Sequence, residues 1–248
     1  MALFRNPVES HFHSQQVLNL LYEYDSFLDS IKVVADMGCG SGLDTKWWAT
    51  LHTRDDIPVP HNYMVYAVDK NIAQLEPDAL QPNVTPIEDD FEFRIVPRQT
   101  DLIWAHDVLQ YALNPIGTLT AWRETLNVDG MLVISVPQIT YMDHGRLRTV
   151  NHSNQYHSFN TLNLMYMLAL AGFDCRDAYF YREPNTPWLY AAVYASEHKL
   201  MPGATWYDLA DRNLINDSVI NSVNKYGYAR LEDIYVCWLD KNNYLITD

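Results

Sequence analysis

Three glycines alternate with other residues in the stretch VVADMGCGSGLDTKWWATL, residues 33–51: Gly38, Gly40 and Gly42. A glycine-rich turn between a strand and a helix presents free backbone N–H groups and lets a ligand approach the main chain closely. A dinucleotide-binding turn has the spacing G-x-G-x-x-G, but the sixth position here is Leu43. The spacing therefore argues against a nicotinamide or flavin cofactor. A binding turn for another ligand and a tight turn without a ligand are the alternatives.

Acidic residues end the strands that are predicted around this turn. Asp36 ends the first strand and Asp69 the second, while Asp89 and Asp90 follow the third. The carboxyl ends of parallel strands meet at one edge of a sheet, where open α/β sheets bind their ligands. A carboxylate after the second strand can accept hydrogen bonds from both hydroxyls of a ribose. We therefore expect the acids and the glycine turn to form one ligand-binding site.

Strands and helices alternate along most of the chain, which indicates an α/β fold with a parallel sheet covered by helices on both faces. The strands are predicted within 31–38, 63–71, 83–91, 100–115 and 131–137, followed by a hairpin from 174–182 and 188–196. The helices are predicted within 14–30, 43–53, 116–130 and 158–173. Pro86 favours an edge position for the third strand or a place at the end of that strand, because proline cannot donate to a ladder.

The alternating pattern changes after residue 198. The remainder is predicted to hold one helix over 205–226 and a hairpin over 231–247 that turns at DKNN. We therefore expect a domain over 1–198, whose residues 1–30 are a leading helical segment, and a C-terminal extension over 199–248.

Composition limits the partners of this chain. Seventeen basic and thirty-one acidic residues give a net charge of −14, which disfavours nucleic acid and anionic membrane surfaces. No apolar stretch approaches the roughly 20 residues that span a bilayer, and the N-terminus lacks the order of a secretory signal. The three cysteines lie far apart without a CxxC spacing. This indicates reduced thiols, a cytoplasmic location and no zinc site.

Several segments resemble, in order, the motifs of class I S-adenosylmethionine-dependent methyltransferases. They are VVADMGCGSGLD, VYAVDKN, IEDDF, TDLIWAHDVLQYALNP, LNVDGMLVISVP and AGF, and together they extend over about residues 30–195. The resemblance implies a Rossmann-like methyltransferase fold with a seven-stranded, mostly parallel sheet. Its last strand would be antiparallel and would come from the hairpin over 173–194.

The resemblance also implies roles for individual residues. Asp36 would hold the methionine end of S-adenosylmethionine, Asp69 the ribose, and Asp89 or Asp90 the adenine amine. The main chain of the turn, at Gly38, Cys39, Gly40 and Gly42, would lie close against the cofactor. Lys70 would lie beside the adenine, and Ala105 and His106 would line the floor of the site after the fourth strand. Family members often have an apolar residue where this chain has Lys70. The motif IEDDF can be aligned in two ways that differ by one position, so either Asp89 or Asp90 could contact the adenine.

Residues 137–158 form a long segment after the fifth strand, at the predicted ligand edge of the sheet. Loops of this length are uncommon unless they are functional, and histidine titrates near the pH at which proton transfer is needed. We select His157 and His144 from this segment, and His106 after the fourth strand, as candidate catalytic bases. The alternatives are a surface loop with scattered histidines and catalysis by positioning alone.

The resemblance implies methyl transfer by direct displacement to an oxygen or nitrogen of a small-molecule, sugar or peptide acceptor, leaving S-adenosylhomocysteine. The chain lacks the N/D-P-P-Y/F tetrad after the fourth strand that a resemblance to amino-directed nucleic-acid methyltransferases would require. It also lacks the Pro-Cys pair that a cytosine-C5 methyltransferase would need. A catalytically inactive binding module, an aminopropyl transferase and a dinucleotide oxidoreductase are the other interpretations. We expect a small-molecule acceptor as partner, with a homodimer left open.

Overall fold

A computed structural model describes residues 30–51, 63–93, 96, 99–149, 155–182, 185–198 and 203–239. The predicted leading helix over 14–30 lies outside these residues except for Ser30, and so does the second arm of the predicted final hairpin. Among the described residues, no helix combines the length and the apolarity needed to cross a membrane.

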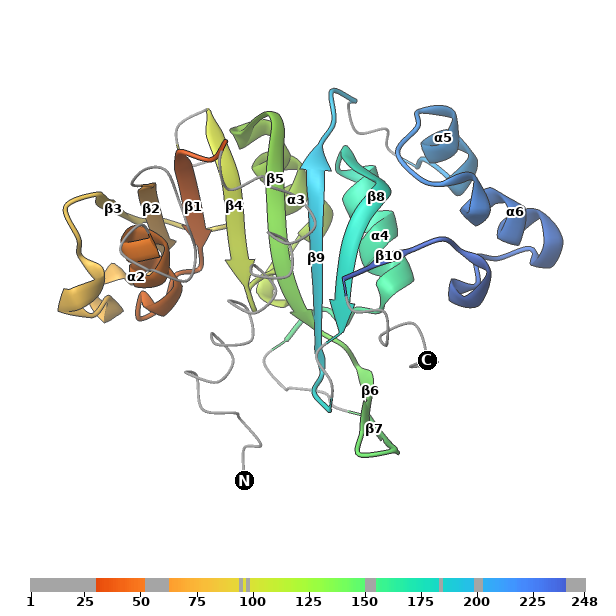
Figure 1. The fold of residues 1–248 in the computed structure, drawn as a ribbon, viewed down its shortest axis with the longest axis horizontal. Coiled ribbons are helices and arrows are strands. Elements are labelled where there is room, and N and C mark those ends of the chain that lie inside the picture. Colours follow the sequence, from red (N-terminus) through yellow and green to blue (C-terminus); the bar gives the residue numbers. More distant parts are fainter. Residues whose placement is uncertain are drawn as a thin grey trace.

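One mixed sheet forms the centre of the molecule (Figure 1). Its strands are β1 (Val33–Met37), β2 (Met64–Asp69), β3 (Val84–Glu88), β4 (Thr100–His106), β5 (Leu126–Pro137), β8 (Phe173–Arg182), β9 (Trp188–Ala195) and β10 (Cys237–Trp238). The order across the sheet is β10-β8-β9-β5-β4-β1-β2-β3. Strand β9 runs antiparallel to both of its neighbours, and the other pairs are parallel. The predicted mostly parallel sheet is thus confirmed, and β3, which contains Pro86, is an edge strand as expected.

In the part of the chain that the structure describes, the sheet has eight strands, one more than the seven predicted. The additional strand, β10, comes from the C-terminal extension and pairs in parallel with β8 at the edge of the sheet. Its side chains explain this position, because the Trp238 ring lies 6.2 Å from the Phe180 ring and 4.9 Å from the Arg182 guanidinium. Aromatic and cation–π contacts of this kind fasten a strand that is too short to be stable alone.

Helices cover both faces of the sheet, as predicted (Figure 1). Helix α2 (Leu43–Thr50) packs on one face, and α3 (Pro115–Thr125) and α4 (Thr161–Leu170) pack on the other. Along β4, Trp104 joins the aromatic core under α2, whereas Ala105 joins the larger core under α3 and α4. This alternation follows from the two-residue period of a strand. Short 3₁₀ helices lie at Ile72–Gln74, Pro77–Ala79, Leu109–Tyr111 and Leu231–Asp233.

The boundary between α3 and β5 differs from the prediction. The sequence predicts a helix over 116–130 that ends at a glycine and a strand from residue 131, but the helix ends at Thr125 and β5 begins at Leu126. Leu126 pairs with Thr100 of β4, and Asn127 Nδ2 donates to Asp101 Oδ1 at 2.6 Å. These contacts with β4 extend the strand in front of Gly130.

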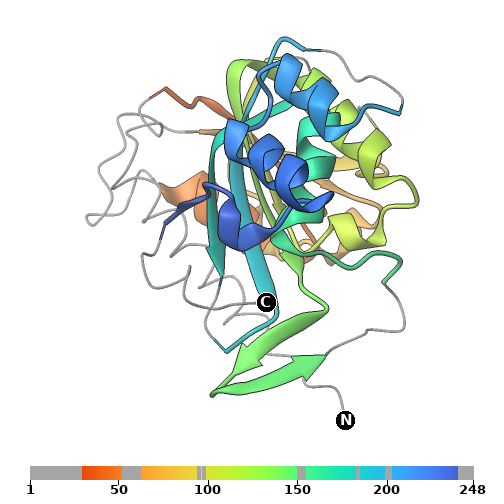
Figure 2. The ribbon, with the colours of Figure 1, turned by 90° about the vertical axis from the view of Figure 1, so that its right-hand side faces the viewer.

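The predicted single helix over 205–226 is two helices, α5 (Trp206–Asp211) and α6 (Asp217–Tyr226) (Figure 2). Asn213 has a left-handed φ of 55°, which interrupts the first helix, and Asn216 Oδ1 caps the second by accepting from Ser218 N at 2.9 Å. The buried residues Leu214 and Ile215 lie between them and belong to the core of the sheet domain. A domain boundary at residue 198 stays a prediction.

Part of the predicted functional loop is a two-stranded hairpin that projects from the carboxyl edge of the sheet (Figures 1 and 2). It consists of β6 (Thr140–Asp143) and β7 (Arg146–Thr149). The turn is formed by His144 and Gly145, with φ values of 46° and 76°. The described side chains of β7 are all exposed.

Candidate cofactor and acceptor site

The glycine turn between β1 and α2 uses its three glycines in two ways. Gly38, Gly40 and Gly42 have left-handed φ values of 73°, 52° and 85°. A side chain at Gly38 would come within 2.5 Å of Val108 Cγ2, and one at Gly42 within 2.7 Å of Ala79 Cβ. At Gly40, no atom of the described residues lies within 4 Å of such a position. Packing therefore requires the outer glycines, while Gly40 leaves the main chain open to a ligand.

Asp69 lies directly against this turn. Its Oδ2 accepts a hydrogen bond from the main-chain N–H of Gly40 at 3.0 Å, and its Oδ1 accepts from Asn71 N at 3.0 Å. Each carboxylate oxygen can accept a second hydrogen bond. Two neighbouring hydroxyls, such as those of a ribose, match the remaining capacity of the carboxylate.

Asp36 ends β1 beneath the same turn. It is 2% exposed, and its Oδ2 accepts a hydrogen bond from Thr45 Oγ1 at 2.6 Å. Burial and the charges of Asp36 and Asp69 raise the pKa of the Cys39 thiol well above its ordinary value. Burial is the largest cause of this shift, and the two carboxylates add to it. The carboxylates of Asp36 and Asp69 make the turn a better site for a cationic ligand than for an anionic pyrophosphate.

Lys70 and Asp90 form an ion pair just beyond the ends of β2 and β3. Lys70 Nζ lies 2.9 Å from Asp90 Oδ2, and this contact raises the pKa of the lysine. The main-chain N–H of Asp89 donates to the main-chain oxygen of Asp69 at 3.0 Å. Its side-chain Oδ1 accepts a hydrogen bond from the main-chain N–H of Asp90 at 2.7 Å. Among the described residues, no group bonds to Asp89 Oδ2. Asp89 is therefore the freer of the two carboxylates proposed for an adenine amine.

The two residues that end β4 point to opposite faces of the sheet. Ala105 is buried under α3 and α4, so only its main chain is available to a ligand at the edge. His106 lies on the other face, where its Nδ1 is 3.2 Å from Ser135 Oγ. Its ring centre is 5.9 Å from that of Trp188 and 6.3 Å from that of Tyr190.

Gln110, in the 3₁₀ turn after β4, is a site residue that the sequence analysis did not select. It is 0% exposed, and its Nε2 donates to the carboxylate of Asp107. Its main-chain oxygen accepts from Tyr156 N at 2.9 Å and from His157 N at 3.2 Å. The turn after β4 therefore binds the segment before α4. The only sequence signal was a polar residue within the otherwise apolar run VLQYAL.

The candidate histidines have different surroundings. His157 lies beside the Gln110 turn, and its Nε2 is buried without a hydrogen-bond partner in the part of the chain that the structure describes. His144 lies at the tip of the β6–β7 hairpin with 84% of its side chain exposed, and its main-chain N–H donates to Asn185 Oδ1 at 2.8 Å. His152, also in the predicted loop, lies outside the described residues.

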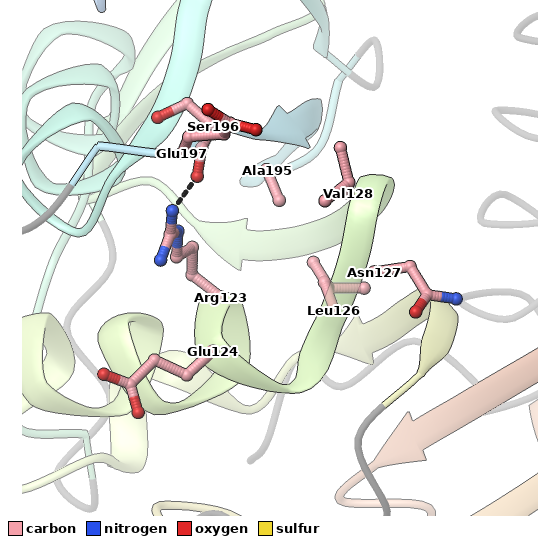
Figure 3. A pocket seen from close by; sticks show the side chains of 8 residues that line it. All are labelled: Arg123, Glu124, Leu126, Asn127, Val128, Ala195, Ser196 and Glu197. Atoms are coloured by element: carbon pink, nitrogen blue, oxygen red, sulfur yellow. Dashed lines mark hydrogen bonds between the residues drawn. The ribbon is translucent and has the colours of Figure 1, made fainter.

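A hollow of about 160 Å³ lies at the opposite edge of the sheet, where β9 ends and β5 begins (Figure 3). Its lining consists of Arg123, Glu124, Leu126, Asn127, Val128, Ala195, Ser196 and Glu197. The Arg123 guanidinium donates to the main-chain oxygen of Ser196 across it. This hollow is separate from the glycine turn. Within the described residues, no three His, Cys, Asp or Glu side chains gather as a metal site would require.

No model of a known protein family matches the chain. Over 107 residues it is 31% identical to the malonyl-[acyl-carrier protein] O-methyltransferase 2 of Coxiella burnetii, a stretch that covers 43% of this chain and 41% of that relative. The match thus spans less than half of the length of the curated relative.

Solved structures resemble the chain over more of its length. A chain from Listeria monocytogenes assigned to the S-adenosylmethionine-dependent methyltransferases matches 77% of this chain and 100% of its own, with a TM-score of 0.56 and 14% identity. The phosphoethanolamine N-methyltransferase 2 of Haemonchus contortus, solved with S-adenosyl-L-methionine, matches over 74% of this chain and 53% of its own, with a TM-score of 0.55 and 13% identity. This chain has the Rossmann-like fold of the class I S-adenosylmethionine-dependent methyltransferases.

Proposed function

We propose that this chain is an S-adenosylmethionine-dependent methyltransferase that acts on an oxygen or nitrogen of a small-molecule acceptor. The observation that carries the proposal is the arrangement at the carboxyl edge of β1 and β2. There the Asp69 carboxylate binds the main chain of Gly40, and Gly40 borders space that no described atom fills. In an open α/β sheet this edge is where ligands bind.

The charge of the turn supports a sulfonium cofactor. The carboxylates of Asp36 and Asp69 lie at the turn, and their charges add to the larger effect of burial in raising the pKa of the Cys39 thiol. Two carboxylates at one turn disfavour further negative charge there. When bound, S-adenosylmethionine supplies an electrophilic methyl group on a positively charged sulfur. A negative potential attracts such a cation, whereas it would oppose the pyrophosphate of a dinucleotide.

Each acidic residue is suited to bind a different part of this cofactor. Asp36 is suited to the methionine ammonium group, because a buried carboxylate binds a cation strongly. Asp69 has acceptor capacity left for two ribose hydroxyls, and Asp89 has an oxygen left for the adenine amine. Lys70, held by Asp90, lies at the margin of the adenine position.

His157 is the proposed proton acceptor. In the transfer, a lone pair of the acceptor oxygen or nitrogen forms the new bond to the methyl carbon, and the pair of the broken carbon–sulfur bond stays on sulfur. The proton that the acceptor loses passes to Nε2 of His157, which has no partner among the described residues. Neutral imidazole is suited to this step near pH 7.

The names of the similar proteins are compatible with either oxygen or nitrogen as the acceptor atom. The relative from Coxiella burnetii is named as an O-methyltransferase, and the enzyme from Haemonchus contortus as an N-methyltransferase. Both names support methyl transfer as the reaction, and they leave oxygen and nitrogen as candidates for the acceptor atom.

A pair of histidine variants tests the role of His157. With an acceptor found by screening for S-adenosylhomocysteine release, His157→Ala is expected to lower kcat about 10²- to 10⁴-fold, the usual contribution of a general base. His144→Ala is the matched control and is expected to keep kcat, because that side chain is 84% exposed at the hairpin tip. Equal effects of the two substitutions would remove His157 from this role.

A further inference from the structure

Two buried polar atoms without hydrogen-bond partners lie on the segments after β4 and before α4, the first of which contacts the glycine turn. They are Oε1 of Gln110 and Nε2 of His157, and neither has a partner among the described residues. Leaving a buried polar atom unpaired destabilises a folded protein, so such atoms are uncommon and suggest an external partner.

The orientation of the Gln110 side chain is determined by its neighbour. Its Nε2 donates to the Asp107 carboxylate. A flipped amide would place Oε1 against that carboxylate and would repel it. Gln110 therefore presents a carbonyl oxygen, which can only accept a hydrogen bond.

The position of these atoms relates them to the glycine turn. Val108, two residues before Gln110, has its side chain against Gly38. The Gln110 main chain holds Tyr156 and His157, and Tyr156 in turn lies near enough to Lys70 to contribute to its raised pKa. The unpaired atoms therefore lie on segments of which one borders the turn and the other the Lys70 residue that follows β2.

We propose that Gln110 and His157 together bind the methyl acceptor and select one that carries a hydrogen on its reacting group, an alcohol, phenol or amine rather than a carboxylate. Both atoms are acceptors, so an amine can donate one hydrogen to Gln110 Oε1 and another to His157 Nε2. An alcohol or phenol donates its single hydrogen to one of the two, and in the transfer that hydrogen passes to His157 Nε2. A carboxylate offers no hydrogen to Oε1 and adds negative charge near Asp107. This inference rests on the proposed function and narrows its acceptor class.

The opposing explanation is that the two side chains bond to each other in solution. The stability of the cofactor-free protein distinguishes the two. If the atoms await a ligand, His157→Phe, which keeps a ring but removes Nε2, leaves Tm equal or higher. If they are partners, His157→Phe lowers Tm by about 2–4 °C or more, the shift expected for loss of one buried hydrogen bond in a chain of this size. That result would overturn the proposal. Gln110→Met is not used for this comparison, because it also removes the hydrogen bond to Asp107.

Binding of small probes tests the acceptor class directly. The protein saturated with S-adenosylhomocysteine is titrated with benzyl alcohol, benzylamine and benzoate, which match in size, and the affinity of each probe is measured by calorimetry. In the proteins that retain His157, its ring signals are also followed by NMR. We expect the alcohol and the amine to shift these signals and to bind at least tenfold more tightly than benzoate. Gln110→Met and His157→Phe abolish the preference, whereas Gln81→Met, at a glutamine that bonds to Asp78 O at 2.7 Å, keeps it.

Preference for benzoate, equal binding of the three probes or no binding of any of them would overturn the inference. Calorimetry with S-adenosylhomocysteine is carried out first, because it distinguishes failure of the acceptor inference from failure of the proposed function. If the protein binds S-adenosylhomocysteine but not the alcohol or amine, only the acceptor inference fails. If it does not bind S-adenosylhomocysteine, the proposed function fails.

Discussion

The Asp69 carboxylate connects the two elements that form the proposed cofactor site. Its oxygens accept main-chain hydrogen bonds from Gly40 and Asn71, both at 3.0 Å. Because both donors belong to the protein, the carboxylate orders the turn before any ligand binds. The acceptor positions that remain on the charged carboxylate are then available to a ligand without rearrangement of the turn, which reduces the free-energy cost of binding.

The substitution Asp69→Asn tests this role. The amide keeps one acceptor oxygen but loses the charge, and a hydrogen bond to a charged group contributes about 1.5–3 kcal/mol. We therefore expect calorimetry to show S-adenosylhomocysteine binding weakened about 10- to 100-fold. Asp78→Asn is the control, since Asp78 is an exposed acid that pairs with Lys46. Equal affinity of the two variants would contradict the assignment of the ribose to Asp69.

Local rules predict some of the site residues and miss others. Asp36 and Asp69 follow from the rule that acids after parallel strands meet at one edge. The long loop after the fifth strand points to His157, but Gln110 is missed, because the main-chain hydrogen bonds that connect it to His157 join segments distant in the sequence. His144 resembled His157 in the sequence, but hairpin pairing carries it to an exposed tip.

At the scale of elements, the turn between β1 and α2 combines packing with access. Gly38 N and Cys39 N donate to Val68 O at 2.8 and 3.0 Å, so β2 holds the turn in place. Val108 fills the space beside Gly38, which connects the turn to the segment after β4. These contacts fix the conformation that leaves Gly40 accessible.

Alanine substitutions in the turn should separate the packing role of Gly38 from the ligand access provided by Gly40. Each introduces a left-handed alanine, at a cost of about 1–2 kcal/mol. At Gly38 the new Cβ also lies 2.5 Å from Val108 Cγ2, so Gly38→Ala should lower Tm clearly more than Gly40→Ala. Gly40→Ala should instead weaken S-adenosylhomocysteine binding. Thermal unfolding and calorimetry measure both, and a Gly40→Ala variant with unchanged affinity would argue against ligand contact there.

Element types were predicted better than element ends. The strand–helix alternation identified β1 to β5 and the helices between them, because periodicity reflects burial directly. The start of β5 depends on pairing with β4, and the break between α5 and α6 depends on one left-handed asparagine. The hairpin β6–β7 gave no signal, since its exposed strands lack the alternation that a buried face imposes.

At the scale of the whole molecule, the C-terminal extension completes the core and the sheet. Leu209, Leu214, Ile215 and Val219 belong to the same apolar cluster as α4 and β8. Tyr166 of α4 donates through its hydroxyl to Ala204 O at 2.5 Å. The extension therefore contributes to the stability of the domain that holds the site.

Removal of residues 199–248 should consequently destabilise the rest of the chain. Loss of the four buried side chains exposes apolar surface worth about 1.5–3 kcal/mol for each large residue, comparable in sum to the stability of a typical domain. We expect the truncated chain to aggregate or to unfold without cooperativity in a thermal scan. A truncated chain with the Tm of the intact protein would show that the extension folds independently.

The central claim is tested most directly by calorimetric titration of the intact protein with S-adenosylmethionine, S-adenosylhomocysteine and NAD. We predict micromolar binding of the first two at one site per chain and no heat from NAD, because the turn is negative and open at Gly40. Binding of NAD, or of none of the three, would contradict the proposed function.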